Sequence, residues 1–307
     1  MKQKIRIGTR GSRLAIWQAE YLAEQLRQAD SALEIEIVTI TTSGDKILDV
    51  PLAKIGGKGL FTKEIEREIL DGTIDIAVHS LKDMPTDLPD GLVIGAVTKR
   101  TDPRDALVSL SGKSFDELPV GARVGTSSLR RRAQLLALRP DLQIIDLRGN
   151  VDTRLAKLQN GELDAVVLAA AGLQRLGLQE NITELFALER FLPAVGQGIL
   201  AVEARAGDDK ILNILRTVND EATAASAEAE RSFLRRIEGG CQIPVGVYAE
   251  TSDGKTGITA LIASLDGRQI VRGTLKGKAA GSGKIGISLA DALLADGGDR
   301  ILQEIKV

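Results

Sequence analysis

One pattern occurs twice in this chain, and it limits the possible folds more than any other feature. A strand-like segment that ends in Gly-Thr and a serine appears at residues 6–12 (RIGTRGS) and again at residues 123–128 (RVGTSS). After a second strand-like segment at 34–41 and 142–147, each copy has an Asp-Gly or Asn-Gly pair that ends a helix and then a third strand-like segment, within residues 71–78 (DGTIDIAV) and 160–167 (NGELDAVV). Helical periodicity fills the stretches between, so the repeat predicts two βαβαβ lobes, each with a mostly parallel sheet.

Segments outside the repeat join the lobes and add a third domain. Strand patterns at 103–109 and 193–204 lie near the two places where the chain would cross between lobes. After residue 217 the expected elements are a helix at 221–237, strands at 245–250, 257–264 and 269–275, and one helix at 288–303. We therefore predict lobe 1 from 1–98 and 199–216, lobe 2 from 99–198, and a small α+β domain from 217–307. Two crossings would make a hinged pair with a cleft, and such sheets bind ligands beyond the carboxyl ends of their strands.

Composition excludes several classes of function. A formal net charge of −2 gives no global basic field for nucleic acid. One cysteine cannot form an internal disulfide, and one cysteine with one histidine makes a zinc or iron–sulfur site improbable. The first residues lead directly into a strand pattern, and no apolar run has the length of a membrane span. We expect a cytoplasmic protein that binds no metal, no nucleic acid and no membrane.

Arginines follow the strand ends in three clusters. A single cluster of this kind is as well explained by a solvated helix face. Here each cluster falls just after a strand, where free backbone N–H groups and the positive end of a helix attract anions. The sequence therefore predicts a site for a ligand with several negative groups, bound by Arg10, Arg13, Arg130, Arg131, Arg132, Arg148 and Arg154.

Four further features bear on chemistry. Cys241 follows a glycine pair and precedes Pro244, so we expect it on a shaped loop that carries a group covalently; the alternative is a buried thiol acting as a small hydrophobe. The polar segment 42–59 is long enough to be a lid or binding loop. Asp83, next to Lys82, has two interpretations: it is a residue that favours a turn before Pro85, or it is a carboxylate at the rim of the cation-lined cleft. His79 is expected to be buried and neutral.

These motifs, taken together and in order, resemble the porphobilinogen deaminase (hydroxymethylbilane synthase) family over essentially the whole chain. The motifs that carry the resemblance are residues 6–12, 56–61, 79–85, 125–131, 147–154 and 196–198, with the loop around Cys241. The resemblance implies an α/β fold of two hinged lobes similar to type II periplasmic binding proteins, with a small α+β C-terminal domain. It also implies a monomer.

The resemblance implies a chemistry as well. A dipyrromethane cofactor would be attached to Cys241 through a thioether, and four porphobilinogen molecules would be joined to it with loss of four ammonia molecules. Hydrolysis would then release linear hydroxymethylbilane for tetrapyrrole and haem biosynthesis. The implied cofactor-binding residues are Cys241, Ser80, Lys82, Asp83, Thr126, Ser128, Arg130, Arg131, Asn150 and Gly172. The implied substrate-binding residues are Arg10, Ser12, Gln18, Lys58, Phe61, Arg148, Arg154, Arg175 and Gln197.

Asp83 is the residue that we expect to be catalytic. A carboxylate near the pyrrole N–H groups would stabilise the cationic stages of the condensation; protonation of the leaving amine by the same carboxyl is the alternative role. A second function from another class is a binding protein that closes on an anion without chemistry. The missing signal-peptide pattern, the missing helix-turn-helix pattern and the cysteine loop all argue against it.

Overall fold

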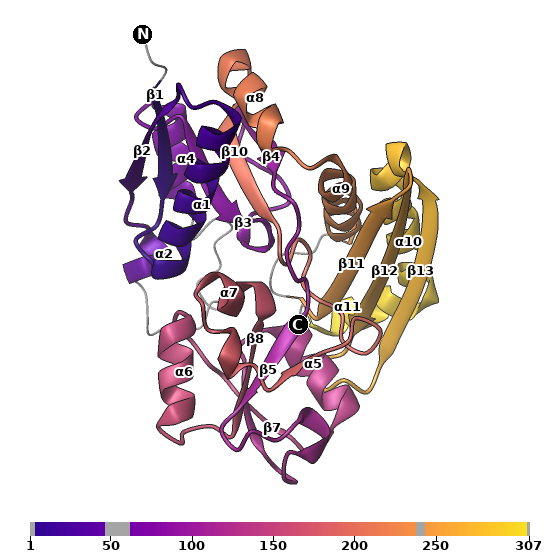
Figure 1. Ribbon diagram of the computed structural model, residues 1–307. Helices are drawn as coiled ribbons and strands as arrows, with labels where there is room; N and C mark the ends of the chain where they lie inside the picture. The colour runs from indigo at the N-terminus through magenta and orange to yellow at the C-terminus, as the bar shows by residue number, and fades with distance from the viewer. Residues whose placement is uncertain (1–3, 47–61, 238–242, 306–307) are drawn as a thin grey trace. The chain divides into compact units, whose positions relative to one another are not determined.

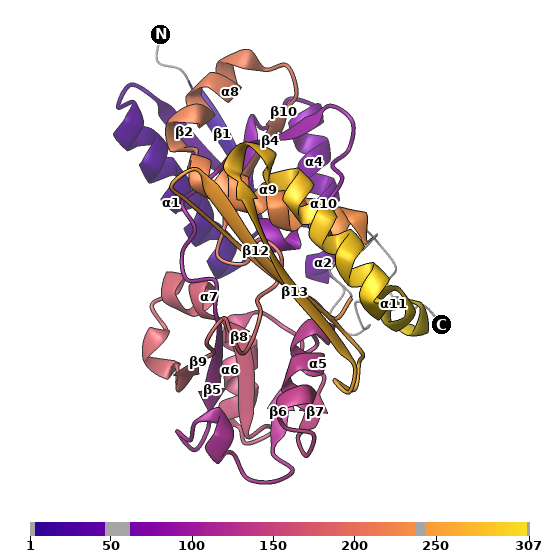
Figure 2. The ribbon, with the colours of Figure 1, turned by 90° about the vertical axis from the view of Figure 1, so that its right-hand side faces the viewer.

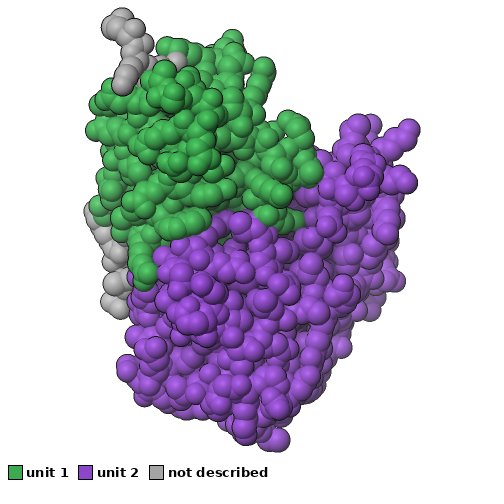
Figure 3. Space-filling view, viewed as in Figure 1, with its two compact units in different colours: residues 1–100, 199–224 green, residues 101–198, 225–307 purple. Residues whose placement is uncertain are grey.

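The computed structural model describes residues 4–46, 62–237 and 243–305 (Figure 1). The chain forms two compact units, which Figure 3 colours separately: residues 1–100 with 199–224, and residues 101–198 with 225–307. Residues 225–307 therefore group with the predicted lobe 2, and the division into three domains stays a prediction.

The first unit is built on a five-stranded sheet with the strand order β2-β1-β3-β10-β4. β1 pairs in parallel with β2 and β3, whereas β10 runs antiparallel to β3 and β4. The elements are β1 (Lys4–Thr9), α1 (Arg13–Ala29), β2 (Glu34–Thr39), α2 (Ser43–Lys46), α4 (Lys63–Leu70), β3 (Ile76–Ser80), η1 (Leu81–Asp83), β4 (Leu92–Val97), β10 (Leu200–Arg205), α8 (Asp209–Leu215) and η4 (Arg216–Val218).

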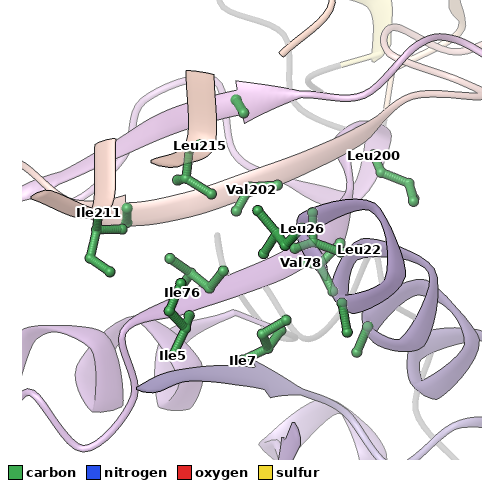
Figure 4. Close-up of a cluster of buried hydrophobic side chains, with 14 of the residues drawn as sticks. Ile5, Ile7, Leu22, Leu26, Ile76, Val78, Leu200, Val202, Ile211 and Leu215 are labelled. Carbon is green, nitrogen blue, oxygen red and sulfur yellow. The ribbon is translucent and has the colours of Figure 1, made fainter. Parts of the chain in front are cut away.

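Helix α1 lies on this sheet because its apolar residues recur at helical spacing. Leu22 and Leu26 are fully buried and pack with Ile7 of β1 and Val78 of β3, as Figure 4 shows. Burial of each such side chain contributes about 1.5–3 kcal/mol to the free energy of folding. The hydroxyl of Ser12 caps the helix by accepting from the backbone N–H of Ala15.

The second unit contains a sheet of the same plan, with the order β7-β6-β8-β5-β9. β6 is parallel to β7 and β8, and β5 is antiparallel to β8 and β9. Its elements are β5 (Asp105–Ser109), η2 (Phe115–Glu117), β6 (Arg123–Gly125), α5 (Leu129–Leu138), β7 (Gln143–Ile145), α6 (Val151–Gln159), β8 (Ala165–Ala169), α7 (Ala170–Arg175), η3 (Gln179–Asn181) and β9 (Glu184–Leu185).

An arginine–aspartate pair ties the strands together at the same place in both sheets. In the first unit, the backbone N–H, Nε and Nη2 of Arg6 donate to the carboxylate of Asp75 at 2.8, 3.1 and 3.0 Å. In the second unit, the same three groups of Arg123 donate to Asp164 at 2.7, 3.2 and 3.0 Å. The two copies of the repeat therefore share even these individual hydrogen bonds.

The rest of the second unit is an antiparallel meander with helices on one face (Figure 2). Phe233 of the first helix and Leu289 of the second pack on Val247 and Ala260 of the strands. On the other face, Leu261 and its neighbours contact α5 and Leu192. The elements are α9 (Glu221–Arg236), β11 (Val245–Ser252), β12 (Lys255–Ala263), β13 (Ile270–Lys278), η5 (Ala279–Gly281), α10 (Ser282–Leu293), a π-helical turn (Leu294–Gly298) and α11 (Asp299–Ile305).

Two predicted elements are wrong in their extent. The single helix expected at 288–303 begins at Ser282 and is interrupted at Gly297, whose φ of 102° is not helical. The strand expected at 193–204 begins only at Leu200, because residues before it form turns in which Gly196 and Gly198 have positive φ. The predicted fold class is confirmed: two βαβ sheets with a small three-stranded α+β part. Among the described helices, none is long and apolar enough to cross a membrane.

Candidate functional site

In the first unit, predicted site residues gather at the carboxyl ends of β1 and β3. Ser12 accepts from the backbone N–H of Ala15 at 3.3 Å, which fixes the start of α1 just beyond β1. Nε2 of Gln18 on that helix donates to Oγ of Ser80, the last residue of β3, at 2.9 Å. Arg10 lies half-buried between β1 and α1. The structure thus brings these predicted residues together around one end of the sheet.

A short 3₁₀ turn after β3 carries Lys82 and Asp83. Its first residue, Leu81, is buried, and its backbone N–H donates to the carbonyl of Ile199 at 3.0 Å. This anchor leaves Lys82 half-buried and Asp83 exposed. The turn therefore presents a carboxylate, as catalysis by Asp83 would require.

Behind this turn lies a buried polar group that the sequence did not predict. His79 is buried as expected, and its Nε2 lies 3.2 Å from a carboxylate oxygen of Glu203, which is fully buried on β10. Glu66 of α4 is also buried. Burial raises the pKa of the Glu66 carboxyl, and the nearby charge of Glu203 raises it further against the opposing effect of His79.

In the second unit, the matching turn after β6 opens helix α5. The hydroxyl of Ser128 accepts from the backbone N–H of Arg131 at 3.4 Å, and Oγ1 of Thr126 accepts from the N–H of Ser128 at 3.2 Å. Gly125 allows this close packing, since a Cβ there would lie 2.6 Å from the Leu163 side chain. The turn holds the N-terminus of α5 at the end of the sheet.

Arg130 and Arg131 in the first turn of α5 are buried, and both donate to the carboxylate of Asp105. Burial lowers the pKa of the Arg130 guanidinium, while the charge of Asp105 opposes that change. Nε of Arg130 is buried and has no hydrogen-bond partner in the part of the chain that the structure describes. Arg132, by contrast, is exposed.

The N-terminus of α6 holds three more predicted residues. Asn150 caps the helix by accepting from the backbone N–H of Thr153 at 2.8 Å, and Nε of Arg154 donates to the carbonyl of Gly149 at 2.8 Å. Arg148 lies just before the cap. Its Nη2 is buried and finds no acceptor within the described residues.

Gly172 and Arg175 lie on α7, directly after β8. Arg175 is buried, and its Nη2 donates to the carbonyl of Gly198 at 2.9 Å and to Oγ1 of Thr101 at 3.2 Å. Gln197 is buried as well, and its Nε2 donates to the carbonyl of Pro103 and to Asp105. Both side chains are thus held by protein groups of the same unit.

Three predicted site residues, Lys58, Phe61 and Cys241, lie outside the described residues. Sequence reasoning also missed two buried carboxylates in the second unit. Asp105 accepts hydrogen bonds from the two arginines of α5. Glu230 of α9 accepts from the backbone N–H groups of Gly196 and Ala249, both at 2.7 Å. Neither lies in a motif, and only long-range contacts identify them.

The fold and these residues define an α/β protein of paired βαβ sheets that places cations at helix N-termini, as suits an anionic ligand. Two family models match the chain: the dipyromethane cofactor binding domain of porphobilinogen deaminase at residues 5–213, and the porphobilinogen deaminase C-terminal domain at residues 224–295. The chain therefore belongs to the porphobilinogen deaminase family, whose members are transferases.

Individual relatives agree with this assignment. The porphobilinogen deaminase of Syntrophotalea carbinolica is 52% identical over 99% of this chain and 96% of its own length. That of Desulforamulus reducens is 51% identical over 100% of this chain and 99% of its own. Among solved structures, the methionine binding protein MetQ covers 70% of this chain and 88% of its own, with a TM-score of 0.44 and 16% identity.

Proposed function

We propose that this chain is a hydroxymethylbilane synthase, which condenses four porphobilinogen molecules head to tail and releases four ammonia molecules. Hydrolysis of the bond to the cofactor then releases linear hydroxymethylbilane. Its place would be in tetrapyrrole and haem biosynthesis. In a chain of this family, the observation that carries the proposal is the pair of buried donors, Arg130 Nε and Arg148 Nη2, that lack an acceptor among the described residues. A substrate rich in carboxylates supplies such acceptors.

The same observation fits the cofactor that the family model names. A dipyrromethane carries acetate and propionate side chains, which match the basic and N–H-bearing groups at the starts of α5 and α6. We propose that these side chains are held by Ser80, Lys82, Thr126, Ser128, Arg130, Arg131, Asn150 and Gly172, with a thioether to Cys241. When bound, the group supplies the carbon to which the first porphobilinogen is joined.

The chain's own residues bind, orient and stabilise charge. Arginine forms bidentate pairs with carboxylates, so Arg10, Arg148 and Arg154 would hold the acetate and propionate of the incoming pyrrole. Asp83 would face the pyrrole N–H groups and stabilise the positive charge that develops when ammonia leaves and when the new bond forms. Ser12, Gln18, Lys58, Phe61, Arg175 and Gln197 complete the proposed substrate site.

Replacement of Asp83 tests its role. Asp83→Asn keeps the size of the side chain but removes the charge, so the purified variant should fold and carry its cofactor while turnover of porphobilinogen falls about 100-fold or more. Asp90→Asn, an exposed change in the following segment, is the matched control and should be neutral. Turnover by Asp83→Asn close to that of the wild type would remove the electrostatic role.

The intact mass of the denatured protein tests the function itself. An excess equal to two linked pyrrole units, absent in Cys241→Ser, supports a covalent primer and the condensation reaction. A bare mass that gains this excess after incubation with porphobilinogen or preformed hydroxymethylbilane also supports it. A bare mass that never changes favours a binding protein without chemistry. The expected cytoplasmic location and monomeric state stay predictions, and sedimentation of the purified protein tests the second.

A further inference from the structure

Asp105 is the first residue of β5, and its side chain is fully buried. Oδ2 accepts from Nη1 of Arg130 at 2.6 Å, and Oδ1 accepts from Nε and Nη2 of Arg131 at 2.9 and 2.7 Å. Nε2 of Gln197 adds a further hydrogen bond to Oδ1 at 3.1 Å. Both oxygens of one buried carboxylate are therefore used to hold two neighbouring guanidinium groups.

Each guanidinium also donates to a backbone oxygen. Nη1 of Arg130, which binds Asp105, donates as well to the carbonyl of Leu192 at 2.7 Å, and Nη1 of Arg131 donates to the carbonyl of Val167 at 2.8 Å. Each planar group is thus held by the carboxylate and by one backbone oxygen. One negative charge against two positive charges leaves the cluster with one positive charge in excess, so it can still attract an anion.

The first unit shows that the fold does not need this cluster. In the ladder between β8 and β5, Asp105 pairs with Ala169, and the same register place in the first unit pairs Leu200 with Ser80. Leu200 is buried and apolar.

Counted from the capping serine of each helix, the counterparts of Arg130 and Arg131 are Leu14 and Ala15. One copy of the repeat therefore builds this place from apolar side chains, and buried ion clusters are commonly replaceable by such packing without loss of stability. A purely structural role does not explain why the second copy keeps two buried cations and a carboxylate.

We infer that Asp105 is a positioning residue, which holds the guanidinium groups of Arg130 and Arg131 in the orientation in which they bind the carboxylates of the cofactor. This inference rests on the proposed function. Gln197, through its hydrogen bond to the same oxygen, supports the carboxylate. Without the negative charge, the two cations repel each other and the side chains leave the positions that their hydrogen bonds to Asp105 fix.

The test uses the full-length protein with its cofactor, and Asp105→Asn is the variant. The nearly isosteric amide removes the charge and places an NH2 group against a guanidinium group. Asp75→Asn is the matched control, because that carboxylate also accepts from an arginine, Arg6, and lies 3.6 Å from a second one, Arg205, but belongs to the other sheet. Four quantities are measured: the fraction of protein with the cofactor mass, kcat, KM, and hydrogen exchange of helix α5.

We expect Asp105→Asn to lower the cofactor-loaded fraction, or to raise KM, by about 10- to 100-fold, with faster exchange in the first turn of α5. Asp75→Asn should lower the melting temperature and leave loading and KM unchanged. The inference is overturned if Asp105→Asn loads and turns over like the wild type, whatever stability it loses. The wild-type mass and turnover, measured in parallel, report on the proposed function by themselves.

If Asp105→Asn does not fold, Asp105→Glu decides. It keeps the charge but moves the carboxylate by one methylene group. A folded Asp105→Glu protein with reduced loading supports the positioning role, and wild-type loading by that variant overturns it.

Discussion

At Gly267 the C-terminal meander packs directly against the backbone of α5, the helix that carries the buried arginines. This glycine lies in the turn between β12 and β13, with a φ of +72°. A Cβ at this position would lie 2.4 Å from the carbonyl oxygen of Ala133 and 2.5 Å from the backbone nitrogen of Ala137, both on α5. Backbone atoms cannot turn aside as a flexible side chain can. Gly267→Ala should therefore push the hairpin away from α5.

The cost of this substitution has two parts. An alanine at positive φ costs about 1–2 kcal/mol, and forcing an extra methyl group into a packed contact costs about 1–3 kcal/mol. Gly254, in the turn between β11 and β12, provides the matched control: its φ is +69°, but no atom lies within 4 Å of the position that a methyl group would take there. Gly254→Ala should therefore show only the first part, about 1–2 kcal/mol, and Gly267→Ala the sum, about 2–5 kcal/mol.

Thermal unfolding and hydrogen exchange of the two variants measure the difference. Exchange should rise in peptides from α5 and from the hairpin of Gly267→Ala, and much less in Gly254→Ala. Fluorescence of Trp17, the sole tryptophan, reports on the first unit and should change little in either variant at low temperature. Equal destabilisation by the two substitutions would refute the reasoning, because the close approach to α5 would then contribute nothing.

Two further predictions concern single side chains. Burial raises the pKa of Glu66 above its ordinary value of 4.5, so its contribution to stability is full below that value and is lost as pH rises through the folded-state pKa. Glu66→Gln should therefore melt at a higher temperature than the wild type near about pH 8 and at the same temperature near about pH 4; an equal difference at both would contradict this. Asn150→Ala should lose about 1 kcal/mol with the cap of α6. Asn150→Asp should keep the cap but load less cofactor, and normal loading would argue against Asn150 as a cofactor ligand.

The parts of the fold that the sequence predicted are those with local causes. Ser12 and Ser128 open helices because a serine hydroxyl can satisfy a free N–H in the first turn, and the sequence alone shows their position. Helix α6 is bounded by local signals of the same kind, since Asn150 caps its start and Asn160-Gly161 ends it. The two sheets of the same plan were also predicted, because the repeated strand and turn motifs are visible in the sequence itself.

The parts that the sequence did not predict depend on contacts between distant residues. Asp105 lies 25 residues from Arg130, and Glu230 lies 34 residues from Gly196, so no spacing rule joins them. The break in the last helix depends on the positive φ of Gly297, and a glycine within a periodic pattern does not by itself indicate whether the helix continues. Asp105 is the first residue of β5, and an aspartate at that place carries no local pattern that would mark it as the partner of two arginines.

The two copies of the repeat have remained alike where they support the sheet and have diverged where the ligand would bind. At the amino ends of the strands, Arg6 with Asp75 and Arg123 with Asp164 keep the same hydrogen bonds. At the carboxyl ends, the first unit follows β3 with a turn that exposes the carboxylate of Asp83, whereas the second follows β8 with a helix and buries cations around a single carboxylate. A reaction that passes through positive charge on a substrate held by its carboxylates needs both kinds of group. The copies therefore differ in the groups that they present, an exposed carboxylate in the first and a buried arginine cluster in the second, while the architecture that supports them is the same.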